Sequence, residues 1–274
     1  MYARILTGGA RMAFSLKENY GPQDLIEIIR ILRAPDGCPW DREQTHASIR
    51  MNFIEETYEA VEAIDKEDSE LLREELGDVL MQVALHAQME AEAGRFDFDG
   101  VCDRVCKKLI YRHPHVFGSA KVETAGQVLQ NWDELKKKEK DQQTLASNLE
   151  AVPVTLPGAM RAAKVQKRAA GYGLCWQDAA EPLEQLSEAG KRLSAAEESE
   201  RQLAAQQLLF AAVGAVRAAG LNPELSLTRA CEQVTHLLAR REAESENGLA
   251  ELSDEEKKQL WREITMFPNG ENPL

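Results

Sequence analysis

The sequence predicts an all-α protein built as two helical bundles. Almost every long segment repeats its apolar residues with the period of a helix. No convincing run alternates apolar and β-branched residues between turn signals, the pattern that predicts a strand. A weak internal repeat also relates the two halves. GCPWD at 37–41 is echoed by GLCWQD at 173–178, and ELGDVLMQVALHAQ at 75–88 by AAQQLLFAAVGAVR at 204–217. This repeat indicates two bundles of similar build.

The apolar period predicts ten helices along the chain. Glycine and proline are turn signals, and they mark the ends of three helices in the first half of the chain. These signals lie at Asp36-Gly37, at Gly94 and at His113-Pro114-His115. In order, the expected helices are 22–33, 42–65, 67–94, 97–112, 124–141, 155–170, 179–194, 198–219, 223–246 and 254–264.

Two segments divide the chain into domains. The opening residues have no evident pattern, so 1–21 is expected to be an N-terminal extension. A charged run is followed by NLEAVPVTLPG at 148–158, in which two prolines interrupt helix formation. We therefore expect a first helical domain over 22–145 and a second over 146–274.

Composition narrows the class of protein. With 274 residues, 43% hydrophobic and 29% charged, the chain resembles an ordinary globular protein. A net charge of −13 opposes adhesion to nucleic acid or to anionic membranes, so neither is expected as a partner. The absence of a long apolar run or a secretory leader, with five scattered cysteines, predicts a cytoplasmic protein.

The sharpest feature of the sequence is an acidic pattern on two successive predicted helices. At about 100° per residue, the acids of the first helix share one arc, and apolar residues occupy the opposite face. The acids are Glu55, Glu56, Glu59 and Glu62, and the apolar residues are Phe53, Ile54, Tyr58, Val61 and Ile64. On its own, this helix also fits a solvated acidic surface.

The second helix favours a metal site. Glu75 borders the apolar stripe of its helix, and Asp78 lies beside it, so these carboxylates are expected to point towards the bundle. Carboxylates held close together and away from water need a proton or a cation. Mg²⁺ prefers oxygen ligands and shares its shell with substrate phosphates. Glu56 and Glu59 facing Glu75 and Asp78 would form such a site.

Gly77 interrupts this second helix at a cost of about 1 kcal/mol relative to alanine. Close approach of another helix or of substrate would explain it, and so would a tolerated packing glycine.

Several sequence blocks occur in a fixed order: GCPWDREQTHASI (37–49), EETYE (55–59), ELGD (75–78), AEAGRFDFDGVC (91–102), RHPHVFG (112–118) and WDELK (132–136), with a weaker continuation in LPGAMRAAKVQKRA (156–169). Together these blocks resemble the MazG family of nucleoside triphosphate pyrophosphohydrolases, in the all-α NTP pyrophosphatase group. The resemblance implies Mg²⁺-dependent hydrolysis of NTPs and dNTPs to the monophosphate and pyrophosphate, with broad base tolerance. It also implies that Glu56, Glu59, Glu75 and Asp78 are metal ligands, and it favours a homodimer.

The second half departs from this pattern. EETYE aligns with EQLSE at 184–188, and ELGD with AAQQ at 204–207. Gln185, Ala204 and Gln207 therefore replace three of the four ligands, and Glu188 alone remains. We expect a degenerate second MazG-like domain that does not hold Mg²⁺ and serves packing, dimerisation or regulation.

Further residues are assigned more open roles. Glu55 could orient or deprotonate the attacking water, although a surface salt bridge would explain it equally. Arg95, Lys108 and Arg112 could clamp phosphates or be ordinary surface cations. Trp40 could stack on a base or plug the core.

Two readings of the whole chain follow. The first is a nucleoside triphosphate pyrophosphohydrolase with Mg²⁺, or Mn²⁺ as a substitute. The alternative is a catalytically silent helical scaffold or regulatory subunit whose acids are solvated. No P-loop motif is present that would offer a different nucleotide site.

Overall fold

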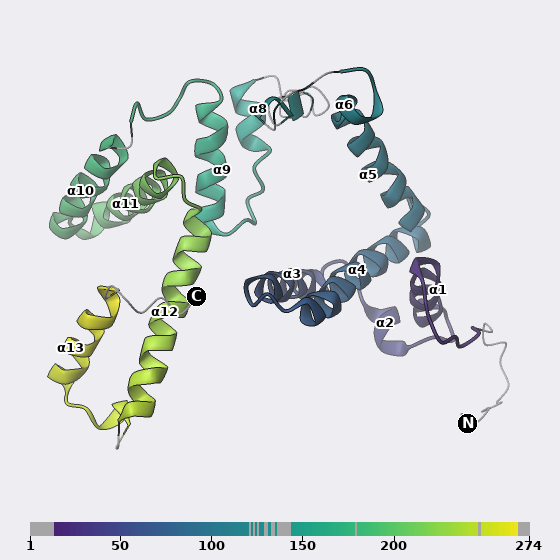
Figure 1. Cartoon of the computed structure of the whole chain (residues 1–274), viewed down its shortest axis with the longest axis horizontal. Coiled ribbons are helices and arrows are strands. Elements are labelled where there is room, and N and C mark those ends of the chain that lie inside the picture. Colours follow the sequence, from purple (N-terminus) through teal and green to yellow (C-terminus); the bar gives the residue numbers. More distant parts are fainter. Residues whose placement is uncertain are drawn as a thin grey trace. The chain divides into compact units, whose positions relative to one another are not determined.

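The computed structural model describes residues 14–120, 144–178, 180–245 and 248–267, together with positions 122, 124, 126–128, 131, 132 and 135. Over these residues every regular element is helical and no strand occurs, which confirms the all-α class (Figure 1). The chain divides into two compact units, residues 1–135 and 136–274. The first unit ends ahead of the predicted boundary near residue 145.

The first unit is built around a long helical hairpin. Its helices are α1 (Pro22–Arg33), α2 (Pro39–Glu43), α3 (Arg50–Asp65), α4 (Ser69–Glu92), α5 (Phe98–Arg112) and α6 (Pro114–Phe117). Helices α3 and α4 pack against each other along their length, and only a short turn joins them (Figure 1). Asp68 starts α4 because its Oδ1 accepts hydrogen bonds from the amides of Glu70 and Leu71, both at 3.0 Å.

The core of the first unit lies at one end of α4. Ile29 of α1 packs there with Ala84, Leu85 and Met89 of α4 and with Ile49. The turn that follows α1 depends on Gly37, because a Cβ at this position would lie 2.3 Å from main-chain oxygens of α1. This core leaves the N-terminal half of α4 to pair with α3.

The helix predicted over 42–65 is shorter in the structure. Residues 39–43 form the separate α2, and α3 begins only at Arg50. Between them, Thr45 and Ser48 satisfy each other's amides through their hydroxyls, at 2.9 and 3.2 Å. Short polar side chains compete with helical hydrogen bonds in this way, which explains the break.

A second interaction fixes the segment before α3. Arg33 donates to the carbonyl oxygens of Asp41 and Gln44 and forms a two-pronged ion pair with Glu92 at 2.8 and 2.9 Å. The segment is thereby tied to both α1 and α4.

The second unit also contains a helical hairpin. Its elements are α8 (Leu145–Glu150), α9 (Gly158–Ala170), α10 (Ala180–Ala195), α11 (Glu198–Ala218), α12 (Pro223–Glu244), the 3₁₀ turn η1 (Leu249–Glu251) and α13 (Asp254–Thr265). Helices α10 and α11 form the hairpin, and α9 and α12 pack against α11 (Figure 1). Helix α8 was not predicted, and most of the helix predicted over 124–141 lies outside the described residues.

Within the described chain, no single helix combines the length and apolar character needed to cross a membrane. Helices α11 and α12 meet the criteria only as a pair, and the chain bends by 100° between them.

Candidate metal centre

The packing of α3 on α4 determines where the acidic side chains lie. The buried residues of α3 are Ala60 and Ala63, whose exposed fractions are 7% and 0%. At about 100° per residue, Glu56 and Glu59 lie on the same side of the helix as these alanines. Small side chains allow the two helices to approach closely, so the carboxylates of α3 face α4.

Three carboxylates converge at this interface. Oxygen atoms of Glu56, Glu75 and Asp78 lie within 4.8 Å of one another, and all three side chains are half-buried. Glu59 is more exposed but lies close enough to hydrogen-bond to Glu56. Glu55 is exposed on α3 and is not part of this group.

The electrostatics of the cluster are unfavourable for charged carboxylates. Burial raises the pKa of Glu56, and the nearby charges of Asp78 and Glu59 raise it further. The pKa of Glu75 is raised in the same way, first by burial and then by Glu59 and Asp78. At neutral pH the group therefore gains from any cation that neutralises it.

The chemistry of the donor set suits a hard divalent cation. The cluster offers only oxygen atoms, and its carboxylates are close enough together to share one ion. One turn along α4, Gln82 is 4% exposed, and within the described residues its Oε1 atom lacks a hydrogen-bond partner. This additional oxygen was not singled out from the sequence. A buried oxygen without a donor is suited to hold a water molecule.

The predicted apolar face of α3 is not buried in the single chain. Phe53, Ile54, Tyr58, Val61 and Ile64 are between 36% and 56% exposed. Amphipathic spacing identified this face as apolar but did not show what covers it. The helix instead packs through its alanines, and its large apolar side chains lie outside.

Gly77 lies on the exposed side of α4. Within the described residues, no atom comes within 4 Å of a Cβ built on it. Close approach of another helix of the described chain therefore does not explain this glycine.

The predicted substrate-binding residues occupy different surroundings. Trp40 is 62% exposed on α2, and Lys108 is half-buried on α5. Arg112 is only 6% exposed, and its guanidinium lies 5.3 Å from the ring centre of Trp132.

Arg95 forms an ion pair with Glu90, at 2.5 and 2.8 Å. Glu90 lies about 18 Å along the axis of α4 from Asp78 at 1.5 Å per residue, so the structure does not bring Arg95 into the acidic cluster.

A histidine pair beside this ion pair was missed from the sequence. His46 and His86 share a hydrogen bond between their Nδ1 atoms at 2.7 Å, and their rings are stacked. The other nitrogen of His46 lies 2.7 Å from Glu90. His46 precedes α3 by several residues and His86 belongs to α4, so only the folded chain brings them together.

Among the described residues of the corresponding hairpin, α10 and α11, no comparable carboxylate cluster forms. Glu188 pairs with Arg192 at 3.4 Å instead of with other carboxylates. Ala204 is buried, and Gln185 and Gln207 line a groove of about 530 Å³ beside Glu188. Across the described residues, the three-carboxylate group is found only in the first unit.

Comparison with known proteins agrees with this geometry. Residues 44–117, which include the whole acidic cluster, match the MazG nucleotide pyrophosphohydrolase domain. A nucleoside triphosphate pyrophosphohydrolase of Escherichia coli K12 is 36% identical over 254 residues, covering 88% of this chain and 95% of the relative. A nucleoside triphosphate pyrophosphohydrolase/pyrophosphatase MazG of Thermotoga maritima is 35% identical over 244 residues, covering 87% and 93%. Since these matches run through both units, the chain belongs to the MazG nucleotide pyrophosphohydrolase family.

Proposed function

We propose that the protein hydrolyses nucleoside and deoxynucleoside triphosphates to the monophosphate and pyrophosphate, at the acidic cluster of α3 and α4. The observation that carries this proposal is the convergence of Glu56, Glu75 and Asp78 within 4.8 Å. The names of the relatives from E. coli and T. maritima support the reaction class.

The ion proposed for this cluster is Mg²⁺, with Mn²⁺ as a substitute. Glu56, Glu75 and Asp78 would hold it, with Glu59 as the fourth carboxylate. When bound, a divalent ion neutralises the triphosphate and the charge that builds on its oxygens during attack. The raised pKa values of Glu56 and Glu75 support a cation, because burial and then the neighbouring carboxylates disfavour their charged forms, and a bound cation offsets both effects.

The proposed reaction joins a water oxygen to the α-phosphorus. The bond from that phosphorus to the oxygen bridging to the β-phosphate breaks, and pyrophosphate leaves with this oxygen. One proton of the water must be removed. We assign this role to Glu55, which precedes Glu56 on α3 and is exposed to solvent.

Broad base tolerance is supported by Trp40. Its indole is 62% exposed, and an indole face can stack on any base without reading its edges. Lys108 and Arg112 remain candidate phosphate ligands on α5, and Arg95 remains one only if substrate reaches beyond the acidic cluster.

The proposed assembly is a homodimer. The exposed apolar face of α3 would be covered by a second copy of the chain, which buries the side chains that the single chain leaves in water. The net charge of −13 supports the expectation that neither nucleic acid nor a membrane is a partner. A cytoplasmic location stays a prediction.

Pyrophosphate release tests the proposed activity directly. The purified chain is expected to release pyrophosphate from several NTPs and dNTPs with Mg²⁺ or Mn²⁺, and not with EDTA. Glu75→Gln should lower the rate by at least about a hundredfold, because the ion loses a ligand.

Glu188→Gln is the control, because it makes the same change at a glutamate of the second unit that aligns with Glu59, in a hairpin where no ion is expected. It should leave the rate unchanged. Full activity in Glu75→Gln would overturn the site. Inactivity of the wild-type chain on every nucleotide would favour the silent scaffold.

A further inference from the structure

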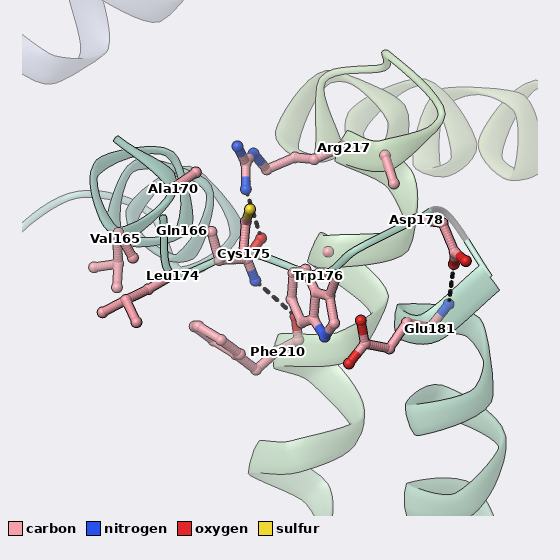
Figure 2. Close-up of a pocket in the computed structure, with 13 residues that line it drawn as sticks. Val165, Gln166, Ala170, Leu174, Cys175, Trp176, Asp178, Glu181, Phe210 and Arg217 are labelled. Atoms are coloured by element: carbon pink, nitrogen blue, oxygen red, sulfur yellow. Dashed lines mark hydrogen bonds between the residues drawn. The ribbon is translucent and has the colours of Figure 1, made fainter. Parts of the chain in front are cut away.

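The second unit contains a cavity of about 580 Å³ between α9, α11 and the segment that precedes α10 (Figure 2). Its walls include Gln166 of α9, Trp176, and Phe210 and Arg217 of α11. Cavities of this volume accommodate small organic molecules. None of these residues belongs to the acidic cluster of the first unit.

Arg217 lines this cavity with its guanidinium. Its Nη1 donates to Oε1 of Gln166 at 3.0 Å, and no carboxylate of the described residues forms an ion pair with it. Arg201 of the same helix, by contrast, pairs with Glu198. Burial lowers the pKa of Arg217, which reflects the loss of water around its charge. A partly buried guanidinium without a counterion favours an anionic ligand.

Gln166 fixes the orientation of the Arg217 guanidinium. Gln166 is 6% exposed, and its Nε2 donates to the carbonyl oxygen of Phe210 at 2.9 Å. This bond orients the amide so that its oxygen faces Arg217 (Figure 2). The remaining guanidinium donors are therefore held in place before any ligand arrives.

An aromatic wall lies beside the cation. Trp176 is seated against α11 at Gly214, where a Cβ would lie 2.3 Å from the indole ring. Phe210 lies next to it, with ring centres 6.5 Å apart and planes tilted by 51°. Such rings can hold a planar group by stacking.

Another part of the cavity is negatively charged, because Asp178 and Glu181 line it. Asp178 accepts from the amides of Ala180 and Glu181, at 2.8 and 3.0 Å, and Glu181 accepts from the amide of Gln177 at 2.9 Å. Figure 2 shows these two carboxylates and Arg217 on different sides of Trp176. The complementary ligand therefore has a planar ring with amino donors and one anionic group.

We propose that this cavity is a non-catalytic binding site for a nucleoside monophosphate, with the phosphate on Arg217 and the base against Trp176. A triphosphate fits less well, because one cation and two carboxylates face it and the described residues offer no metal cluster in this unit. The source of the ligand rests on the proposed function, since a nucleoside monophosphate is its product.

Calorimetric titration of AMP into the full chain in EDTA tests the site without requiring hydrolysis. AMP is expected to bind, and ATP in EDTA to bind more weakly. Arg217→Gln should weaken AMP binding by at least about tenfold, as loss of a hydrogen bond to a charged group does. Arg201→Gln, which removes the same charge from an ion-paired position of α11, should bind AMP as the wild type does.

Two further variants locate the ligand. The double variant Glu56→Gln, Glu75→Gln should keep AMP affinity, because the first unit is not involved. If Arg217→Gln does not fold, Arg217→Lys replaces it and should bind AMP several-fold more weakly, since lysine lacks the planar fork.

Failure of the wild type to bind AMP would overturn the site, as would unchanged binding in a folded Arg217 variant. Tighter binding of ATP than of AMP, or loss of binding in the double variant, would also contradict it. These outcomes are independent of pyrophosphate release, so the proposed activity stands or fails separately.

Discussion

Glu90 illustrates how one residue can link separate segments. It binds Arg95 through two contacts and His46 through a third. These partners, Arg95 first, lower the pKa of Glu90 to about 2. Its charged form therefore stabilises the fold above its ordinary pKa of 4.5, and this contribution is lost as the pH falls through about 2.

Glu90→Gln should lower the melting temperature at pH 7, and the gap from the wild type should narrow as the pH falls below about 4.5. Thermal unfolding followed by circular dichroism at several pH values measures this gap. Glu70→Gln is the control, since it breaks an exposed ion pair within one helix and should have little effect. A gap that stays constant with pH would contradict the assigned contacts.

In the acidic cluster, the pKa shift and its effect on stability have the opposite sign to those of Glu90. The pKa of Glu75 is raised, so without metal its charged form opposes folding as the pH rises above the ordinary value of 4.5 through the raised one. Glu75→Gln in EDTA should therefore melt at a higher temperature than the wild type at pH 8. The difference in melting temperature should disappear when the pH falls below about 4.5, where Glu75 is protonated in both the folded and the unfolded state.

Mg²⁺ should reverse this order. Binding to the folded state alone raises the melting temperature of the wild type with ion concentration, and the Glu75→Gln chain should respond far less. Calorimetric melting with and without Mg²⁺ provides the measurement, and Glu188→Gln should behave as the wild type does. A wild-type melting temperature that ignores Mg²⁺ would argue against a metal site.

At the scale of elements, two helical glycines have opposite surroundings. Gly77 of α4 faces open space, whereas Gly214 of α11 faces the ring of Trp176. Gly77→Ala should raise the free energy of unfolding by about 1 kcal/mol, because alanine is the better helix former. Gly214→Ala should lower it by about 1–3 kcal/mol, because its Cβ overlaps the indole.

Urea unfolding of both variants measures these changes on equal terms. Destabilisation by Gly77→Ala would mean that a surface outside the single described chain packs against this glycine.

For the whole molecule, the exposed face of α3 predicts dimerisation. Light scattering should return twice the chain mass of 30.6 kDa. Ile64→Lys should convert the dimer to monomers, because a charge would enter the apolar contact. Leu227→Lys on α12 is the control, since the two side chains have similar exposed fractions of 56% and 59%. A wild-type monomer would contradict the proposed assembly.

The sequence alone predicted the elements whose helical period runs without interruption. Helices α1, α4, α5, α11 and α12 begin and end within two residues of their predicted bounds. Their caps and breakers act locally, so they can be read from neighbouring residues. The start of α3 could not be read in this way, because Thr45 and Ser48 compete with helix formation through side-chain contacts.

The acidic residues were also identified from the sequence, since helical spacing places Glu56 and Glu59 on one arc of α3. The tertiary structure decided which side of α3 faces α4. Hydrophobic periodicity shows that a face is apolar but not what covers it, so it did not reveal that the alanines of α3 are buried and that Ile64 is exposed. Contacts between distant segments, such as His46 with His86 or Arg217 with Gln166, depend on the folded chain alone. No local pattern encodes such a contact, because its partners meet only when separate helices pack.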